Sequence, residues 1–223
     1  MPIPASFDYD MWLGPAPWAP YHKNRCFYTF RFIKDYAGGE PTNTGAHSFD
    51  IIQWALDMEH TGPVEFEDLG SSFTDGDYLY TAVSTVNFRA RYADGTELLC
   101  FSEGNYMPNL VARFEGSEGW IEAGWYQLKT YPASLKTSVI RPDEINLYKS
   151  TNHYQNFIDC VKTRRDPIAP VETGHRSTSI AHLANIAMAL KDKLHWDPAR
   201  ERFSDNEQAN RMLSRPMRPP WYL

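Results

Sequence analysis

A segment in the first quarter of the chain repeats apolar residues with the 3.6-residue period of an α-helix. It follows a Gly38-Gly39-x-Pro41 turn, after which Thr42, Asn43 or Thr44 can accept hydrogen bonds from the free N–H groups of a new helix. The pattern predicts a helix over residues 43–59. Its apolar side consists of Gly45, Phe49, Ile52 and Leu56, and its polar side consists of Asn43, His47, Asp50 and Trp54.

The polar side of this helix is flanked by further apolar residues, Ile51, Ala55 and Met58. We therefore expect the helix to be covered on two sides, with buried polar groups that need partners. In one interpretation, His47 and Asp50 satisfy each other and cap neighbouring loops. In the other, His47 faces a substrate cleft as acid or base, and Asn43 binds and orients the substrate.

The middle of the chain has the two-residue alternation of β-strands. Residues 64–69 alternate apolar and acidic side chains, and two pairs of strands, 85–92 with 97–102 and 110–114 with 120–125, flank glycine-containing turns. The short connections favour antiparallel pairing. Two further short stretches, 138–141 and 145–148, are candidate edge strands.

One strand of this sheet separates its side chains cleanly between two faces. The first face is apolar and carries Val86, Phe88, Ala90 and Tyr92, and the second carries Asn87, Arg89 and Arg91. Such a sheet fits helices on one side and either a partner subunit or solvent on the other. The predicted fold class is α+β, with an open, predominantly antiparallel sheet and helices packed on one face.

Two helices and a short third one are predicted in the last third of the chain. The first starts at Asn152 and has an apolar face made of Tyr154, Phe157, Ile158 and Val161. The second covers residues 173–194, and a short third helix covers 205–213 before an extended, proline-rich tail that we expect to pack in a groove. The second helix opens with His175 and Arg176, which can hold an anionic group at a helix N-terminus.

The N-terminal segment, residues 1–37, contains five prolines that disfavour helix formation, so we expect an extended arm. Its aromatic residues need an apolar surface to pack on. Residues 27–32 alternate well enough to predict a strand.

Composition places the chain among ordinary globular proteins, with 42% hydrophobic and 22% charged residues in 223. The net charge of -6 argues against nucleic-acid binding, and no segment is long and apolar enough for a membrane span. The three cysteines lack Cys-x-x-Cys spacing, which indicates reduced thiols and no zinc site. Aromatic residues reach 14%, which suits an interface or a cleft that stacks on carbohydrate.

Three segments of the chain resemble the Gfo/Idh/MocA family of NAD(P)-dependent oxidoreductases, which act mostly on sugars and polyols. The helix carries Gly38-Gly39-x-x-x-Asn43-x-Gly45-x-His47-x-x-Asp50, which is similar to the signature helix of the family's second domain. The Trp12-Leu13-Gly14-Pro15-Ala16-Pro17 loop, and the later runs at 156–162, 174–177 and 210–216, resemble one bacterial branch. The resemblance implies a glyceraldehyde-3-phosphate dehydrogenase-like C-terminal domain, whose open sheet commonly forms a dimer interface.

The resemblance also implies roles for individual residues. His47 is the candidate catalytic residue, and Trp12 is a candidate cofactor contact because its loop approaches the cofactor in the family. The candidate substrate-binding residues are Asn43, Asp50, Tyr21, Arg25, His175 and Arg176. Position 43 is Asp in much of the family, and an amide can hold a hydroxyl group but cannot take its proton.

The chain lacks two features that the family places in an N-terminal Rossmann domain: a Gly-x-Gly-x-x-Gly turn and a Glu-Lys-Pro segment with a catalytic lysine. We therefore expect residues 1–223 to be a single domain of the C-terminal type. Its parts are the arm 1–37, the signature helix 38–60, the sheet 64–150, and the helices and tail 151–223. No cofactor is expected on this chain alone, although the family implies NAD(P).

The first functional hypothesis is the substrate-binding and oligomerisation half of a sugar or polyol oxidoreductase, inactive alone. The expected partners are a second copy through the sheet face, a sugar or polyol, and a separate or missing Rossmann domain, in the cytoplasm. The alternative is a stand-alone carbohydrate-binding or oligomerising protein without redox activity. A third hypothesis is lyase, isomerase or hydrolase chemistry without a cofactor on His47 and Asp50.

Overall fold

The structure is a computed structural model that describes residues 1–74, 76, 78–102, 110–144 and 146–221. It combines antiparallel sheets with helices, so the predicted α+β class is confirmed. No helix within these described ranges is long and apolar enough to cross a membrane. The predicted edge strand at 145–148 begins outside the described residues, and 138–141 is not a strand.

The largest sheet has five strands in the order β10-β9-β1-β4-β5, all antiparallel. Their bounds are β1 Glu65–Asp68, β4 Asn87–Arg91, β5 Glu97–Phe101, β9 Lys193–Asp197 and β10 Arg202–Phe203. The predicted Asp94-Gly95 turn joins β4 to β5, and Gly95 has a φ of +91°, which a glycine adopts without steric cost. The strands β9 and β10 were not predicted from the sequence.

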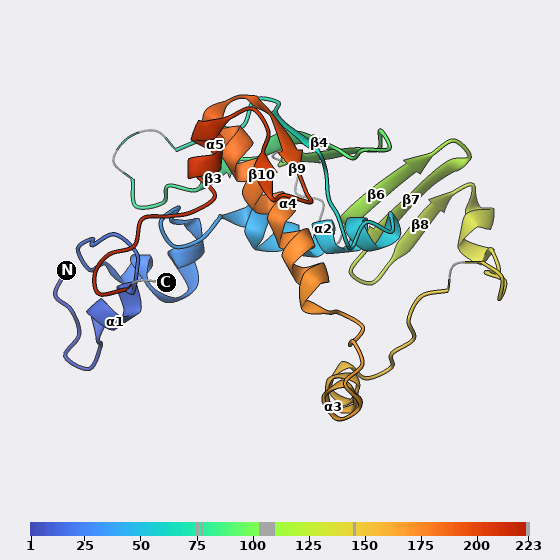
Figure 1. Cartoon of the computed structure of the whole chain (residues 1–223), viewed down its shortest axis with the longest axis horizontal. Helices are drawn as coiled ribbons and strands as arrows, with labels where there is room; N and C mark the ends of the chain where they lie inside the picture. The colour runs from blue at the N-terminus through green and yellow to red at the C-terminus, as the bar shows by residue number, and fades with distance from the viewer. Residues whose placement is uncertain (75, 77, 103–109, 145, 222–223) are drawn as a thin grey trace.

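Two smaller sheets complete the strand inventory of the described residues (Figure 1). The second predicted hairpin is formed by β6 Leu110–Gly116 and β7 Gly119–Gly124, and β8 Leu128–Tyr131, which the sequence did not reveal, adds a third strand. The strands β2 Ser72–Phe73 and β3 Val83–Thr85 pair separately. The predicted sheet region is therefore divided among three sheets.

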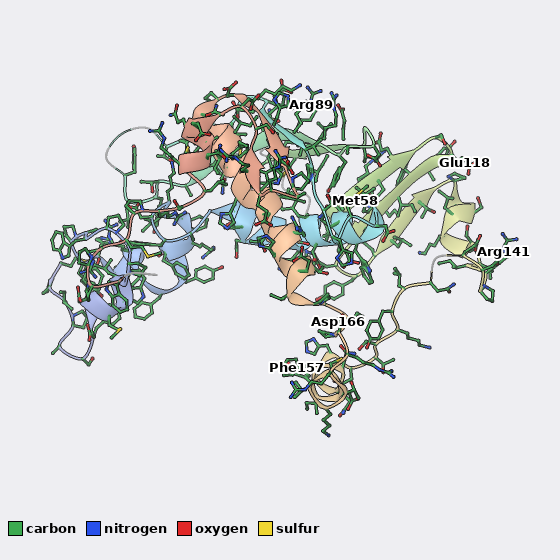
Figure 2. The ribbon with its side chains drawn as sticks, viewed as in Figure 1. Met58, Arg89, Glu118, Arg141, Phe157 and Asp166 are labelled. Atoms are coloured by element: carbon green, nitrogen blue, oxygen red, sulfur yellow. The ribbon has the colours of Figure 1, made fainter. Side chains whose placement is uncertain are left out.

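The hydrophobic core lies between the inner face of the five-stranded sheet and two helices, α2 Thr44–Ala55 and α4 Val171–Leu190. As predicted, Phe88 and Ala90 point into this core with no solvent exposure. The opposite face carries Arg89 and Arg91, which pair with Glu67 and Glu97; Figure 2 shows Arg89 on the outer side of the molecule. Burial of the apolar face is what drives this packing.

The helix α2 follows a short 3-10 turn, η3 Glu40–Thr42, and ends four residues earlier than predicted. The buried side chain of Gln53 explains this end, because its amide donates to the carbonyl oxygens of Met58 and Thr61, each at 2.9 Å. Its oxygen accepts a 2.7 Å hydrogen bond from Tyr92. The backbone carbonyl groups of the turn after α2 therefore find their hydrogen-bond donor in the side chain of Gln53.

Contrary to the expectation of two covered sides, α2 buries one side only. Phe49 is 1% exposed, whereas Trp54 is 41% exposed and His47, Asp50 and Ala55 are also exposed. The helix lies at the edge of the core, so its polar side faces outward.

The N-terminal arm is not extended as predicted. It contains α1 Tyr9–Leu13 and the 3-10 segments η1 Lys23–Arg25 and η2 Phe27–Phe32. The prolines flank α1 and do not interrupt it, and Asp8 caps it by accepting from the N–H of Met11 at 3.0 Å. The strand predicted at 27–32 is wrong, because these residues form a 3-10 helix. Within it, the guanidinium of Arg31 lies over the ring of Tyr28 at 3.7 Å.

The C-terminal part contains α3 His153–Thr163, α4 and α5 Glu207–Arg211. The predicted second helix extended to Leu194, but α4 ends at Leu190 because Lys191 adopts a left-handed conformation, and Leu194 lies in β9. Figure 1 shows α3 standing apart from the sheets. Its predicted apolar face is solvent-exposed, with Phe157 at 64% (Figure 2).

The tail returns to the N-terminal arm, as expected of a packed tail. The guanidinium of Arg218 contacts Asp10 at 2.7 Å and the carbonyl oxygen of Gly14 at 3.0 Å, and its backbone N–H donates to Pro15. The two ends of the chain thus form one lobe beside the main core (Figure 1).

Candidate functional site

The polar side of α2 presents His47 to solvent. The imidazole lies close to the ring of Trp125, which lies in a turn of the sheet β6-β7-β8. The edge contact between His47 and Trp125 has a ring-centroid distance of 4.8 Å and an interplanar angle of 74°. Trp125 lies in the turn between β7 and β8 and is 47% exposed. Among the described residues, the imidazole of His47 has no hydrogen-bond partner, so its nitrogens are available to a ligand.

Asp50 lies one helical turn after His47 and is held by α4. The hydroxyl of Ser177, a buried residue, donates to Oδ1 of Asp50 at 2.9 Å. The interpretation in which His47 and Asp50 satisfy each other therefore does not describe this structure. Asp50 ties α2 to α4 and leaves His47 free.

Asn43 occupies the N-cap position of α2, one turn before His47. Its side chain makes no capping hydrogen bond and instead donates to Oε2 of Glu40 at 3.3 Å. Thr44 donates to the same oxygen at 2.7 Å. The amide nitrogen of Asn43 is thus engaged, and its Oδ1 is an acceptor for a substrate hydroxyl.

Three predicted residues, Trp12, Tyr21 and Arg25, lie in the arm lobe and not beside His47. Tyr21 is buried in the lobe's own core, and the ring of Trp12 packs edge-on against Tyr36 at 5.3 Å. The guanidinium of Arg25 donates to the Tyr36 hydroxyl at 3.3 Å. In the described part of the chain, no hydrogen bond or ring contact links these residues to His47.

The remaining two predicted residues, His175 and Arg176, bind an internal carboxylate. Nε2 of His175 lies 2.6 Å from Glu201, and Nη1 of Arg176 lies 3.3 Å from the same oxygen. His175, chiefly through its hydrogen bond, lowers the pKa of Glu201. The carboxylate of Glu201 therefore takes the place of the anionic ligand expected here. Both residues lie in the second turn of α4, which begins at Val171.

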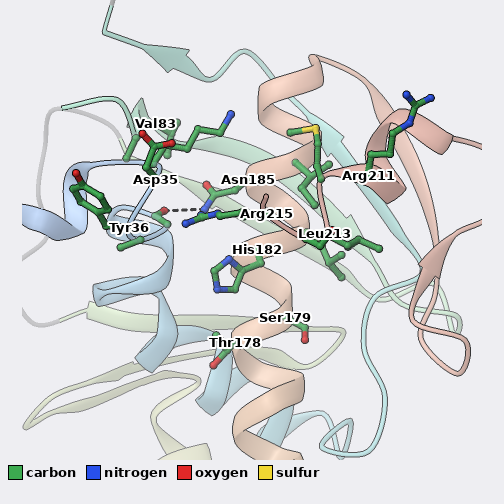
Figure 3. A pocket seen from close by; sticks show the side chains of 18 of the residues that line it. Asp35, Tyr36, Val83, Thr178, Ser179, His182, Asn185, Arg211, Leu213 and Arg215 are labelled. Atoms are coloured by element: carbon green, nitrogen blue, oxygen red, sulfur yellow. Dashed lines mark hydrogen bonds between the residues drawn. The ribbon is translucent and has the colours of Figure 1, made fainter. Parts of the chain in front are cut away.

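A cavity of about 950 Å³ lies beside α4, bounded by the 34–38 loop, by residues 211–216 and by β-strand residues (Figure 3). His175, Thr178, His182 and Asn185 line it. The pKa of His182 is lowered, mainly by partial desolvation and further by the positive charge of Arg215, although the residue stays exposed to solvent. Asn185 donates to the carbonyl oxygen of Gly38 at 2.8 Å, which fixes one wall.

Sequence reasoning missed Trp125 and Arg215. Trp125 comes close to His47 because its sheet contacts α2 through β6, and no local sequence pattern predicts that contact. Arg215 belongs to the C-terminal tail, which is held against the N-terminal arm by Arg218. The position of Arg215 therefore depends on contacts that the sequence does not reveal. Within the described residues, no group of three or more His, Cys, Asp or Glu side chains is arranged to hold a metal ion.

Comparison with known proteins gives a family match over the entire chain. The model described as "Oxidoreductase family, C-terminal alpha/beta domain", of the Gfo/Idh/MocA type, matches residues 1–223. No curated protein sequence matches the chain significantly.

Several solved structures share the fold at low sequence identity. An aldose-aldose oxidoreductase from Caulobacter crescentus, complexed with glycerol, has a TM-score of 0.53 and 18% identity over 75% of this chain. The WlbA dehydrogenase from Bordetella pertussis, in complex with NADH and UDP-GlcNAcA, has a TM-score of 0.50 and 17% identity over 75%. An NAD-binding protein from Listeria innocua has a TM-score of 0.50 and 13% identity over 82%.

This chain covers 51%, 48% and 52% of those three structures respectively, so it spans about half of their length. The whole-chain family match agrees with the segments that resembled this family in the sequence. The chain therefore belongs to the Gfo/Idh/MocA oxidoreductase family and corresponds to its C-terminal alpha/beta domain.

Proposed function

We propose that this domain binds the sugar or polyol substrate of an NAD(P)-dependent oxidoreductase and that His47 exchanges a proton with a substrate hydroxyl. The observation that carries the proposal is the open imidazole of His47 on the family's signature helix, free of hydrogen-bond partners among the described residues. An imidazole accepts or donates a proton near neutral pH, as oxidation of an alcohol requires.

The neighbours of His47 suit a polyhydroxylated ligand. Asn43 offers its side-chain oxygen to a hydroxyl, and Trp125 offers an exposed aromatic surface against which the apolar face of a sugar ring can pack. Asp50 acts as a positioning residue, because its bond to Ser177 fixes the orientation of α2. A proton relay through position 43 is excluded, since an amide does not ionise.

The dinucleotide does not fit this domain by itself. Nicotinamide supplies hydride chemistry in this class, and its pyrophosphate binds to a glycine-rich turn between a parallel strand and a helix. All strand pairs in the described residues are antiparallel, and the 223-residue sequence contains no Gly-x-Gly-x-x-Gly. We expect this domain to contribute substrate binding and proton transfer to the reaction, and to bind no cofactor by itself.

Isothermal titration calorimetry of the 223-residue chain against a panel of neutral sugars and polyols tests the proposal. At least one member should bind, and His47→Ala should weaken that binding by about tenfold or more, because a hydrogen bond to substrate is lost. His60→Ala, which changes another exposed histidine, is the matched control and should bind normally. Equal binding by wild type and His47→Ala would refute the proposal.

The same chain is also assayed with NAD or NADP and the panel. We expect no turnover, and robust nicotinamide reduction would contradict the assignment of hydride chemistry to another domain.

A second candidate function is carbohydrate binding without redox chemistry, favoured by the exposed Trp125 beside His47. The two candidates differ in the consequence of His47→Gln in an active oxidoreductase assembly. A binding role tolerates glutamine, which can still form a hydrogen bond, whereas proton transfer does not.

We further propose that a second copy of the chain docks on the outer face of the five-stranded sheet. This face combines paired charges, such as Arg89 with Glu67, with two exposed apolar residues on the edge strand, Leu99 and Phe101. A mixed face of this kind fits a subunit interface.

A further inference from the structure

The cavity of about 950 Å³ lies on the side of α4 that faces away from Asp50 and the His47 site. Ser177 points toward α2, whereas Thr178 and His182 line the cavity, so α4 separates the two places. The volume falls within the range of small-molecule sites, and half-buried apolar residues such as Phe73 and Trp196 contribute to its walls.

Arg215 gives this cavity a positive charge that the protein does not neutralise. Figure 3 shows its side chain extending between Asn185 and His182. No salt bridge or hydrogen bond engages its guanidinium among the residues that the structure describes. The cavity's Glu201 is already paired with His175 at 2.6 Å.

The other charged residues of the wall do not offset Arg215. In Figure 3 the carboxylate of Asp35 points away from Arg215 and His182, and the guanidinium of Arg211 turns outward. The remaining charged wall residue, Lys34, adds another positive charge. Excess positive potential in a partly enclosed cavity favours a negatively charged ligand.

Uncharged polar groups lie beside this positive centre. The hydroxyl of Thr178 lies on the cavity wall, and no side-chain hydrogen bond engages it within the described ranges. Asn185 uses its nitrogen for Gly38, which leaves its side-chain oxygen as an acceptor for a ligand hydroxyl. Guanidinium groups bind carboxylate and phosphate through paired hydrogen bonds, and hydroxyl-binding groups nearby select a polyhydroxylated molecule.

We propose that this cavity is a second ligand site, which binds a small polyhydroxylated anion with its carboxylate or phosphate between Arg215 and His182. The site is separate from the His47 site and does not depend on the proposed function.

The site should bind its ligand more tightly as the pH falls through the range in which His182 titrates. The pKa of His182 is lowered in the free protein by partial desolvation and by Arg215, and a bound anion would raise it again. Binding would then take up a proton, so protonation and anion binding would reinforce each other. The other titratable residues of the cavity wall are Lys34, Asp35, Tyr36, His175, Glu201 and Arg211, of which Asp35 and Arg211 point away from this pair.

The test is calorimetric titration of the full 223-residue chain, at constant ionic strength, with glucose 6-phosphate, glucuronate, glucose and inorganic phosphate. We expect at least one of the two sugar anions to bind, and to bind at least tenfold more tightly than glucose or inorganic phosphate. Binding by only one of them identifies the anionic group. Arg215→Gln should weaken binding by about tenfold or more, since a charge-assisted contact is lost.

Arg211→Gln is the matched control, because its guanidinium turns away from the cavity, and it should bind like the wild type. His47→Ala should also bind normally, which separates this test from that of the proposed function. On the wild-type chain, NMR titration of His182 should show a higher pKa with the anion bound.

Three results would overturn the inference: no binding of either sugar anion at millimolar concentration, binding of glucose or inorganic phosphate to His47→Ala that equals the binding of the sugar anions, or unchanged affinity in Arg215→Gln. An unchanged His182 pKa in the presence of a bound sugar anion would also contradict it.

Discussion

The polar residues near α2 differ in whether the protein already satisfies their side chains. Asp50 has Ser177, Asn43 has Glu40, and His175 has Glu201. The imidazole of His47 has no such partner among the described residues. A polar group that the fold does not use is available for function, and this separates His47 from Asp50, Asn43 and His175.

Gln53 shows the opposite case, a polar side chain that the fold uses completely. It is fully buried, donates to two carbonyl oxygens and accepts from Tyr92. Burial raises the pKa of Tyr92, so its hydroxyl stays protonated and can donate throughout the neutral range.

Gln53→Met should destabilise the domain by about 2–4 kcal/mol, because one buried and two partly buried groups lose their partner at once. Tyr92→Phe removes one hydrogen bond and should cost about 1–2 kcal/mol. Urea unfolding at pH 7 measures both. A smaller loss for Gln53→Met than for Tyr92→Phe would show that the carbonyl oxygens find other partners.

At the scale of elements, the sequence predicted those units whose signals are local. The Asp94-Gly95 hairpin, the two faces of β4 and the Asn152 cap of α3 all follow from neighbouring residues, and each is confirmed. The signature helix was found for the same reason, although the expected cover on its polar side is absent and that side is exposed.

The secondary-structure predictions were wrong where contacts between distant parts of the chain determine the conformation. The strand predicted at 27–32 is a 3-10 segment that has no neighbouring strand in the described sheets and is held by stacking of Arg31 on Tyr28 and Phe32. Leu194 continues the apolar period of α4, yet Lys191 ends the helix, and β1 takes Leu194 into the sheet opposite Phe66. The contact of His47 with Trp125 joins residues 78 positions apart, which periodicity does not reveal.

The outer face of the five-stranded sheet gives a prediction at this scale. If a second copy docks there, the double change Leu99→Glu with Phe101→Glu should convert a dimer to a monomer, because charges replace the exposed apolar residues. Light scattering coupled to size-exclusion chromatography measures the mass.

The same double change on α3, Phe157→Glu with Val161→Glu, is the control, since that helix also exposes apolar residues. A dimer that survives the change in β5 but not the change in α3 would place the interface on α3.

At the scale of the whole molecule, the arm and the tail form a lobe that closes one end of the cavity beside α4. Pro17 from the arm and Pro216 from the tail both line this cavity. The lobe is held together by Arg218, whose guanidinium contacts both Asp10 and Gly14. The two ends of the chain therefore shape a cavity wall that neither end forms alone.

Arg218→Ala should loosen this lobe without unfolding the core. Loss of charge-assisted bonds worth about 1–2 kcal/mol would speed local opening by roughly 5–30-fold, so amides of α1 should exchange hydrogen faster while those of α4 do not. Hydrogen exchange with mass spectrometry measures both regions. Arg200→Ala, which removes an exposed arginine that pairs with Asp197, is the control and should leave α1 unchanged.

The central claim is that His47 presents its imidazole to a polyhydroxylated ligand. The most direct measurement is the NMR signal of its imidazole Cε1–H group, assigned with His47→Gln among the seven histidines, during titration with a polyol that binds. We expect a saturable shift at His47, with little change at His60 and His195. A ligand that saturates the domain while the His47 signal stays fixed would contradict this claim.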